Sequence, residues 1–177
     1  MTPLYTAVKR FDAADDDWPS YIAWSGLCQL RELVSLDSML CPTWFRTLTE
    51  DDWRYNVKAD FKLELFFDLD HVLARVAAAV RVNVLAVLEE PAEDEVRAFV
   101  DPRFRFRGFD LVEPRTGTSA LVNSGGFPRA FSGAELSEHG LIVDLARAFE
   151  VRDRLRAEYR DDPHSGCACW AIWLLGD

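Results

Sequence analysis

The 177-residue chain has only four cysteines and three lysines, and it has no long apolar run. Four cysteines in a chain of this length do not form the dense disulfide framework of a small secreted domain. The most apolar stretch, residues 72–88, is interrupted by two arginines and an asparagine, so we expect no membrane-spanning segment. Residues 1–11 contain two cations and lead into an acidic run, unlike a secretory signal peptide. These features favour a cytoplasmic protein with no membrane partner.

Basic residues are outnumbered, because 30 acidic residues against 20 basic ones give a formal net charge of −10. The acidic excess is spread along the chain and leaves no basic half. The backbone of a nucleic acid and the surface of an anionic membrane both bind cationic protein surfaces. We therefore expect no nucleic-acid partner, and a protein partner is expected to be basic.

The composition is typical of a folded domain, since 49% of the residues are hydrophobic and 12% are aromatic. These fractions exclude disordered and low-complexity classes. The chain contains no repeat and no Gly/Ser linker, and its length is that of one ordinary domain. We expect a single globular domain over residues 1–177, in which the acidic residues 1–17 form a mobile N-terminal approach.

The apolar patterns predict both strands and helices. Strands are expected at residues 30–36, 61–67, 82–88, 104–111, 119–123 and 167–175, with a helix as the alternative around 30–36. Helices are expected at residues 69–76 and 141–159, with short ones after Thr49 and within 89–100. Because a tight turn joins the strands at 104–111 and 119–123, these two are expected to pair antiparallel. The predicted fold class is α+β, with a mixed or mostly antiparallel sheet and helices packed on a face.

The run that ends in Asp68-Leu69-Asp70 resembles the first motif of haloacid-dehalogenase-type phosphotransferases. The resemblance implies that Asp68 is a nucleophile and Asp70 a general acid/base, with Mg²⁺ beside them. That chemistry also needs a cation that neutralises the phosphate, usually a downstream lysine, and all three lysines lie upstream. The alternative, which we favour, is that Asp68 caps a helix whose first turn contains Asp70.

His164, Cys167 and Cys169 are close enough in the sequence to suggest a metal site. However, no Cys-x-x-Cys pair is present, and a structural zinc ion needs four nitrogen or sulfur ligands. Unpaired cysteine is also among the residue types most often buried. We therefore predict two buried structural thiols in the last strand, no metal site and no cofactor.

One loop is more typical of a ligand site than any other segment, and it consists of Asn123, Ser124, Gly125, Gly126 and Phe127. Its paired glycines allow positive φ, and successive N–H groups in that conformation can bind an anion. Ser124 does not fit the pattern of a nucleophile elbow. The alternative is a tight turn whose phenylalanine fills the core.

His139 is a further candidate catalytic residue, a base with Glu135 or Glu138 beside it. The alternative is an exposed residue that leads into the long helix. A short cationic ridge is also expected on one strand, formed by Arg103, Arg105 and Arg107. In so acidic a chain we expect these arginines to pair with neighbouring carboxylates.

Four of the six tryptophans lie in the first third of the chain: Trp18, Trp24, Trp44 and Trp53. Tryptophan either fills a core or supplies an exposed aromatic anchor for a partner. These four are therefore candidate partner-binding residues, with core packing as the alternative.

Four segments in this order, residues 35–42, 66–70, 125–128 and 170–173, resemble a family of small bacterial proteins without an assigned activity. The size, the acidity and the lack of a nucleophile also resemble the small immunity proteins that neutralise bacterial toxins. We expect a non-enzymatic cytosolic binding protein, immunity-like, that presents acidic and aromatic surface to a basic protein. The alternative is a small hydrolase or transferase with its site at the 123–127 loop, joined by His139 or by the two aspartates. The oligomeric state is left open.

Overall fold

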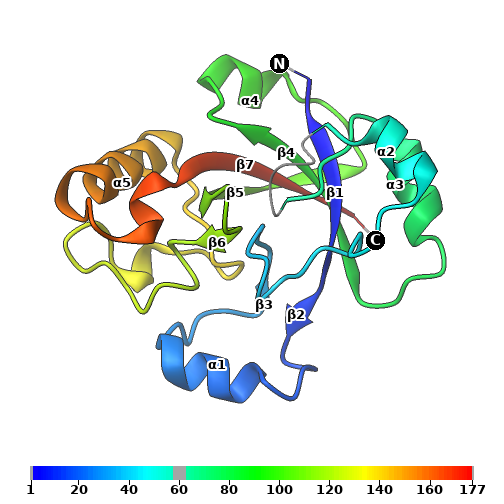
Figure 1. Ribbon diagram of the computed structural model, residues 1–177. Helices are drawn as coiled ribbons and strands as arrows, with labels where there is room; N and C mark the ends of the chain where they lie inside the picture. The colour runs from blue at the N-terminus through cyan, green and yellow to red at the C-terminus, as the bar shows by residue number, and fades with distance from the viewer. Residues whose placement is uncertain (1, 58–62, 177) are drawn as a thin grey trace.

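The computed structural model describes residues 2–57 and 63–176, in which strands and helices are interleaved (Figure 1). The strands are β1 (Leu4–Lys9), β2 (Phe11–Asp12), β3 (Glu32–Leu33), β4 (Val82–Glu89), β5 (Phe104–Glu113), β6 (Thr118–Ser119) and β7 (Ala168–Leu175). The helices are α1 (Trp18–Ser25), α2 (Glu50–Tyr55), α3 (Leu69–Val76), α4 (Glu93–Ala98) and α5 (Leu145–Glu158). Short 3-10 helices lie at Gly133–Glu135 and Pro163–Gly166.

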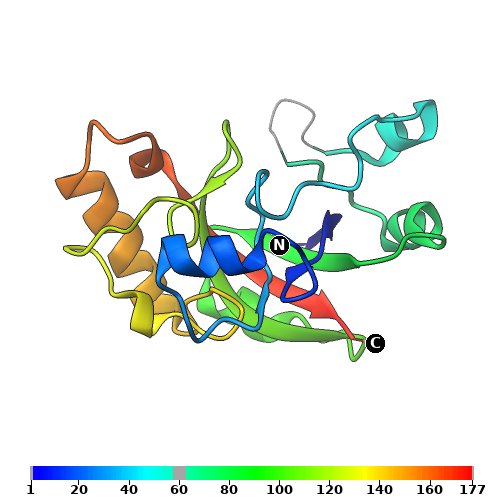
Figure 2. The same ribbon diagram turned by 90° about the horizontal axis from the view of Figure 1, so that it is seen from below.

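A five-stranded sheet in the order β1-β4-β7-β5-β6 forms the centre of the fold, and all its neighbours pair antiparallel. Strands β2 and β3 form a separate pair. Helix α5 packs against β5 and β7, whereas α3 packs against β1 and β4. Figures 1 and 2 show α5 on one side of the molecule and α2 and α3 on the opposite side. The predicted α+β class with a mostly antiparallel sheet is confirmed.

Several elements begin where the sequence predicts a cap. Asp68 precedes α3 and Thr49 precedes α2, and each side chain accepts a hydrogen bond from a backbone N–H in the first turn. Helix α5 begins at Leu145, later than predicted, because Asp144 caps it by accepting from the N–H of Arg147. Strands β4, β5 and β7 lie at three of the predicted positions.

Two predicted strands are much shorter than expected. The strand predicted at 30–36 is reduced to β3, because the chain beyond it bends around a buried side chain: the N–H of Leu36 donates to the carboxylate of Asp110. The strand predicted at 119–123 is reduced to β6, because the N–H of Asn123 turns back to the carbonyl oxygen of Ser119. The apolar pattern of the sequence reveals neither the carboxylate of Asp110 nor the carbonyl oxygen of Ser119 as the acceptor that bends the chain.

The prediction of a strand at 61–67 was also wrong for the residues that the structure describes. Residues 61 and 62 lie outside the described residues, and 63–67 form isolated bridges only, from Phe66 to Tyr5 and Asn56. The short helix predicted within 89–100 is α4.

Residues 1–17, expected to be a mobile approach, instead contain an edge strand of the sheet. β1 pairs with β4 over its whole length, and its residues Thr6, Ala7 and Val8 are buried. Two acids of the run that follows form ion pairs with Arg81. Oxygen atoms of Asp12 and Asp15 lie 2.9 and 2.6 Å from the same Arg81 guanidinium nitrogen. Asp12 and Asp15 thus pair with a cation that is distant in the sequence, whereas Asp16 and Asp17 of the same run remain exposed.

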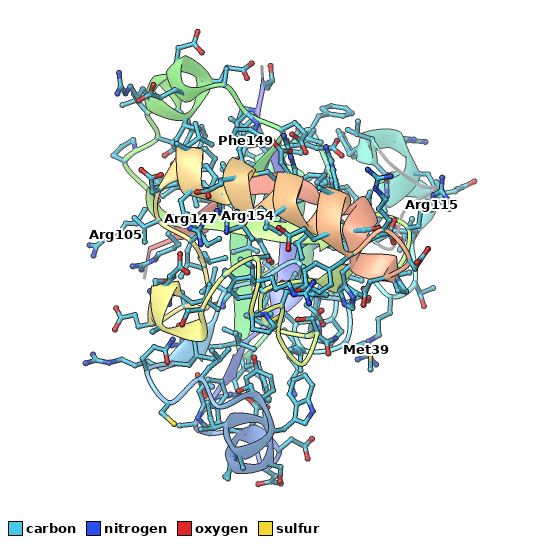
Figure 3. All side chains as sticks on the ribbon, turned by 90° about the vertical axis from the view of Figure 1, so that its left-hand side faces the viewer. Met39, Arg105, Arg115, Arg147, Phe149 and Arg154 are labelled. Carbon is cyan, nitrogen blue, oxygen red and sulfur yellow. The ribbon has the colours of Figure 1, made fainter. Side chains whose placement is uncertain are left out.

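The outer face of α5 carries ion pairs (Figure 3). Arg147 Nε lies 2.7 Å from Glu135 Oε2, and Arg154 Nη2 lies 2.7 Å from Glu150 Oε1. Exposed pairs of this kind contribute at most about 1 kcal/mol each. The buried side chains on the other face of α5 therefore hold it against the sheet.

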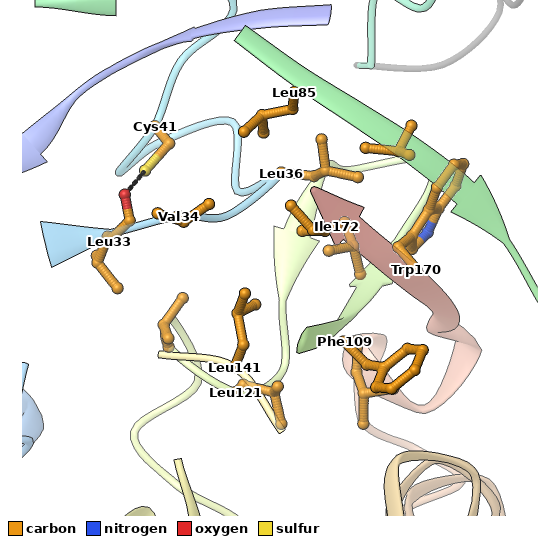
Figure 4. Close-up of a cluster of buried hydrophobic side chains, with 14 of the residues drawn as sticks. Leu33, Val34, Leu36, Cys41, Leu85, Phe109, Leu121, Leu141, Trp170 and Ile172 are labelled. Carbon is orange, nitrogen blue, oxygen red and sulfur yellow. Dashed lines mark hydrogen bonds between the residues drawn. The ribbon is translucent and has the colours of Figure 1, made fainter. Parts of the chain in front are cut away.

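The core is centred on β7, which is buried on both faces as predicted. Figure 4 shows Trp170 and Ile172 of β7 beside Phe109 of β5 and Leu36 from the chain after β3. β7 lies between β4 and β5 in the sheet, so each face of this strand is covered by other elements. A near-continuous apolar strand sequence is typical of such a position.

One buried carboxylate, that of Asp110 in β5, accepts four hydrogen bonds. Its Oδ2 accepts from Ser35 Oγ at 2.6 Å and from the N–H of Leu36 at 3.2 Å. Its Oδ1 accepts from Ser119 Oγ at 2.6 Å and from the N–H of Leu111 at 2.8 Å. None of these four donors is a cation, so the carboxylate is stabilised by neutral groups alone.

A second buried carboxylate, that of Asp37, is joined to the first through Ser119. Asp37 Oδ2 accepts from the N–H of Ser119 at 2.8 Å and from Asn123 Nδ2 at 3.1 Å. Its Oδ1 accepts from the N–H groups of Met39 and Leu40. The two aspartates thus connect the chain after β3 to β5, to β6 and to the loop that follows β6.

Burial raises the pKa of Asp110 to about 6, and the nearby charge of Asp37 acts in the same direction. The hydrogen bonds from Ser119, Ser35 and Leu36 act in the opposite direction but do not outweigh burial. An unfolded chain would ionise this group near pH 3.9. The folded state therefore holds the proton more tightly, and stability is lost as the pH rises from about 4 to about 6.

The substitution Asp110→Asn tests this network. At neutral pH we expect the free energy of unfolding to fall by about 1–3 kcal/mol, because one buried N–H, of Leu36 or Leu111, loses its acceptor. The difference between wild type and variant should be up to about 3 kcal/mol larger near pH 4, because only the wild type then carries the stabilising proton. Urea unfolding at the two pH values measures it. A difference that grows with pH would contradict the raised pKa.

Candidate functional site

A largely apolar groove of about 480 Å³ lies between the C-terminal end of α1 and the loop after β6. The apolar side chains that line it include Trp24, Leu27, Leu121, Phe127, Pro128 and Phe131. Ser124, Gly125 and Gly126 also line it, so the structure brings the predicted ligand loop and one of the candidate tryptophans together. We call this cavity the Trp24 groove.

The loop is shaped by its glycines and anchored by its asparagine. Gly125 and Gly126 have φ of +72° and +99°, the conformation predicted for them. Asn123 points away from the groove toward Asp37, to which its side-chain amide donates. Phe127 is buried against the ring of Tyr159, with 4.8 Å between the ring centroids. The loop is therefore both a tight turn with a core phenylalanine and one wall of the groove.

Helix α1 forms the other wall. Tyr21 is buried in this helix, and its hydroxyl group donates to the carbonyl oxygen of Val122 at 3.0 Å, which fixes α1 against the floor of the groove. Trp24 lies one turn further along α1, and 57% of its surface is exposed. The groove thus combines a fixed floor with an exposed aromatic rim.

The four candidate tryptophans separate into two groups. Trp24, Trp44 and Trp53 are exposed, whereas Trp18 is buried, with its ring centroid 5.2 Å from that of Phe11. Trp18 is therefore a core residue, and its assignment to a partner-binding surface is corrected. Its burial follows from the position of α1, which covers β2 with this side chain.

The polar groups beside the groove are occupied within the protein. The Ser124 hydroxyl donates to the carbonyl oxygen of Ala120 at 2.7 Å and accepts from the N–H of Gly126. His164 Nδ1 lies 2.7 Å from Asp162 Oδ1, and its Nε2 lies 3.2 Å from the carbonyl oxygen of Asn123. Because both ring nitrogens face oxygen acceptors inside the protein, His164 is not positioned to accept a proton from Ser124.

The two aspartates of the phosphotransferase-like motif lie elsewhere. Asp68 caps α3 by accepting from the N–H of His71 at 2.8 Å, so the predicted cap is confirmed. Asp70 is exposed in the first turn of α3. Figure 1 shows α3 on the side of the molecule opposite α5 and the loop after β6. The enzyme alternative that joins these aspartates to the loop therefore lacks the required proximity.

His139 is not exposed, and of the two predicted neighbours Glu138 lies beside it, with Oε1 3.8 Å from His139 Nε2, whereas Glu135 does not. Its ring nitrogens are buried, and Glu135 instead binds Arg147. Burial lowers the pKa of His139, and the charge of Arg107 lowers it further. The backbone carbonyl oxygen of His139 accepts from the N–H of Val34, which holds this loop against the core and keeps the side chain mostly buried.

Cys167 and Cys169 are fully buried at β7, as predicted for structural thiols. Burial raises the pKa of Cys167 to about 12 and also raises that of Cys169, so both remain protonated at neutral pH. Within residues 2–57 and 63–176, no group of three or more His, Cys, Asp or Glu side chains is placed to hold a metal ion.

Comparison of the chain with models of protein families, with curated proteins and with solved structures found no match. Among the described residues, no helix is long and apolar enough to cross a membrane.

The sequence predictions did not include Asp37 and Asp110. Asp37 binds the side chain of Asn123 in the groove loop, and Ser119 joins Asp37 to Asp110. A signal was present for Asp110, a single acid inside the apolar stretch Phe109-Asp110-Leu111, whereas Asp37 lies between Leu36 and Ser38. Such an acid is either exposed or buried with several donors, and the pattern alone does not decide between these.

The cap at Asp68 allows a direct test of the phosphotransferase-like motif. Asp68→Asn should change the free energy of unfolding by less than about 0.5 kcal/mol, because asparagine caps as well as aspartate. Asp68→Ala should lower it by about 1 kcal/mol, because the N–H of His71 loses its acceptor. Urea unfolding measures both. Mg²⁺-dependent hydrolysis of a phosphate ester that Asp68→Asn abolishes would contradict the capping role.

Proposed function

We propose that this chain is a non-enzymatic binding protein of the cytosol, immunity-like in its mode of action, that binds a basic protein through its acidic surface and the Trp24 groove. The observation that carries the proposal is the exposed Trp24 at the rim of an apolar groove. Tryptophan is among the residue types enriched at the anchors of protein interfaces. The groove is wide enough to receive an apolar side chain of the partner.

Charge favours a basic partner. The net charge of −10 gives the protein a long-range attraction for cations and opposes contact with nucleic acid. Asp17 precedes Trp24 by seven residues, which is about two helical turns, so the exposed acid and the exposed ring share one face of α1. Arg129, which follows the lining residue Pro128 in the sequence, is exposed but does not itself line the groove. A partner would therefore place a cation near α1 and its apolar side chain in the groove.

The alternative of a hydrolase or transferase receives less support from the same geometry. A nucleophilic serine needs a base within hydrogen-bonding distance. The Ser124 hydroxyl donates to a backbone carbonyl instead, and Asp68 and Asp70 lie on the other side of the molecule. We therefore propose binding rather than a reaction as the role of the groove.

The test compares two tryptophans of equal exposure. Trp24 and Trp53 are 57% and 56% exposed, but only Trp24 lines the groove. Tagged wild type, Trp24→Ala and Trp53→Ala are used to capture proteins from a lysate of the native host, at low and high salt, and the captured proteins are identified by mass spectrometry. Affinity for the purified partner is then measured by calorimetry.

We expect one basic protein to be captured by wild type and by Trp53→Ala. Its affinity for Trp24→Ala should be weaker by about 2–4 kcal/mol, because the interface loses an anchor. Association should slow between roughly 0.05 and 0.5 M salt, as the Debye length falls from about 14 to about 4 Å. Equal affinity for Trp24→Ala, or an acidic partner, would contradict the proposal. Specific capture of nothing at low salt, with a metabolite bound beside Gly125 and Gly126, would favour the enzyme alternative.

A further inference from the structure

A second cavity, of about 380 Å³, opens at the end of the sheet where β4 and β5 begin and β7 ends. Its charged and amide side chains come from separate parts of the chain: Arg10, Glu32, Asn83, Arg105 and Arg107. We call this cavity the arginine pocket. Figure 3 shows Arg105 at one edge of the molecule and Arg115, which follows the end of β5, at the opposite edge.

Charges on one side of this pocket balance each other. Three cations and three carboxylates form one network, which consists of Lys9, Arg10, Arg81, Asp12, Asp15 and Glu32. Within it, Arg10 Nε lies 2.8 Å from Asp12 Oδ2 and 3.1 Å from Glu32 Oε1. Glu32 also accepts from Asn83 Nδ2 at 2.7 Å. Among the residues that the structure describes, Glu32 is the one carboxylate that lines the pocket, and it is already bound, so this network contributes no net charge.

Arg105 and Arg107 add two positive charges that the network does not neutralise. Neither guanidinium forms an ion pair or a hydrogen bond with any described residue, whereas Arg103 of the same expected ridge binds Asp101 at 2.7 Å. The prediction that all three arginines pair with neighbouring acids therefore holds for Arg103 alone. Arg107 also lies close enough to His139 to lower its pKa, together with burial.

A β-bulge in β5 sets the position of Arg107. Phe106 pairs with Trp173 and Gly108 pairs with Ile172, so Arg107 is the extra residue of a β-bulge. Gly108 has φ of +135°, and a Cβ there would lie 2.7 Å from the carbonyl oxygen of Ile142. Only glycine fits this bulge. The Nε of Arg107 is buried and has no hydrogen-bond acceptor, which is a costly state for a charged group.

We infer that the arginine pocket binds a small oxyanion, with a phosphate or carboxylate group held by the guanidinium groups of Arg105 and Arg107. Guanidinium stays charged at all physiological pH values and donates pairs of hydrogen bonds that match such oxygens. The volume lies near the lower end of the range for ligand pockets, roughly 300–1,000 Å³, and fits a small metabolite rather than a polymer. The overall charge of −10 opposes anions only at long range, which salt screens beyond about 8 Å.

Thermal unfolding of the full chain with added anions tests this inference. Inorganic phosphate, pyrophosphate and citrate are each titrated at neutral pH, and sodium chloride keeps the ionic strength constant. A bound anion raises Tm in a saturable way. Wild type is compared with Arg105→Gln, Arg107→Gln and the matched control Arg115→Gln, which removes an exposed arginine that also has no ion pair with a described residue.

We expect a saturable rise in Tm for wild type and for Arg115→Gln. The apparent affinity should fall about tenfold in Arg105→Gln, because a charge-assisted hydrogen bond is lost. Arg105 is exposed, so this variant serves even if Arg107→Gln fails to fold. A response to phosphate and pyrophosphate identifies a phosphate ligand, and a response to citrate alone identifies a carboxylate. No rise beyond that with chloride, an unchanged affinity in Arg105→Gln, or an equal loss in Arg115→Gln would overturn the inference.

Discussion

Ser119 joins two buried carboxylates, since its hydroxyl donates to Asp110 and its backbone N–H donates to Asp37. An ionised carboxylate that is removed from water without donors costs many kcal/mol, so both must be surrounded by donors in the folded state. Those donors come from the chain after β3, from β5 and from β6 and its following loop. These segments, far apart in the sequence, must therefore be in place together, and the rest of the structure is arranged around them.

The Trp24 groove depends on this constraint. Asn123 binds Asp37 from the loop, and Tyr21 binds the carbonyl oxygen of Val122 from α1, so both walls are fixed to the same buried framework. A rigid groove loses little conformational entropy when a side chain enters it. The arginine pocket has the opposite character, because its two uncompensated guanidinium groups point to a polar, anionic occupant. The two cavities therefore select ligands of different chemistry.

Asp52 shows how strongly the partner of a buried acid determines its behaviour. Burial alone would raise its pKa, but Arg75, which donates to both carboxylate oxygens at 2.8 and 3.1 Å, and His71 outweigh burial and hold the pKa well below its usual range. Asp110 has only neutral donors, and its pKa is raised. Acidification thus weakens the contact between α2 and α3 while it favours the centre of the sheet.

The sequence by itself determined the α+β class, the buried strand β7, the cap at Asp68 and the positive φ of the paired glycines, because each follows from local periodicity or from the conformational limits of one residue. It did not place β1 in the sheet, assign Trp18 to the core, or distinguish Arg103 from Arg105 and Arg107. These features depend on partners distant in the sequence: the pairing of β1 with β4, the position of α1, and the ion pairs that neutralise some cations and leave others. Only the tertiary structure decided them, because burial and electrostatic compensation are properties of neighbours in space.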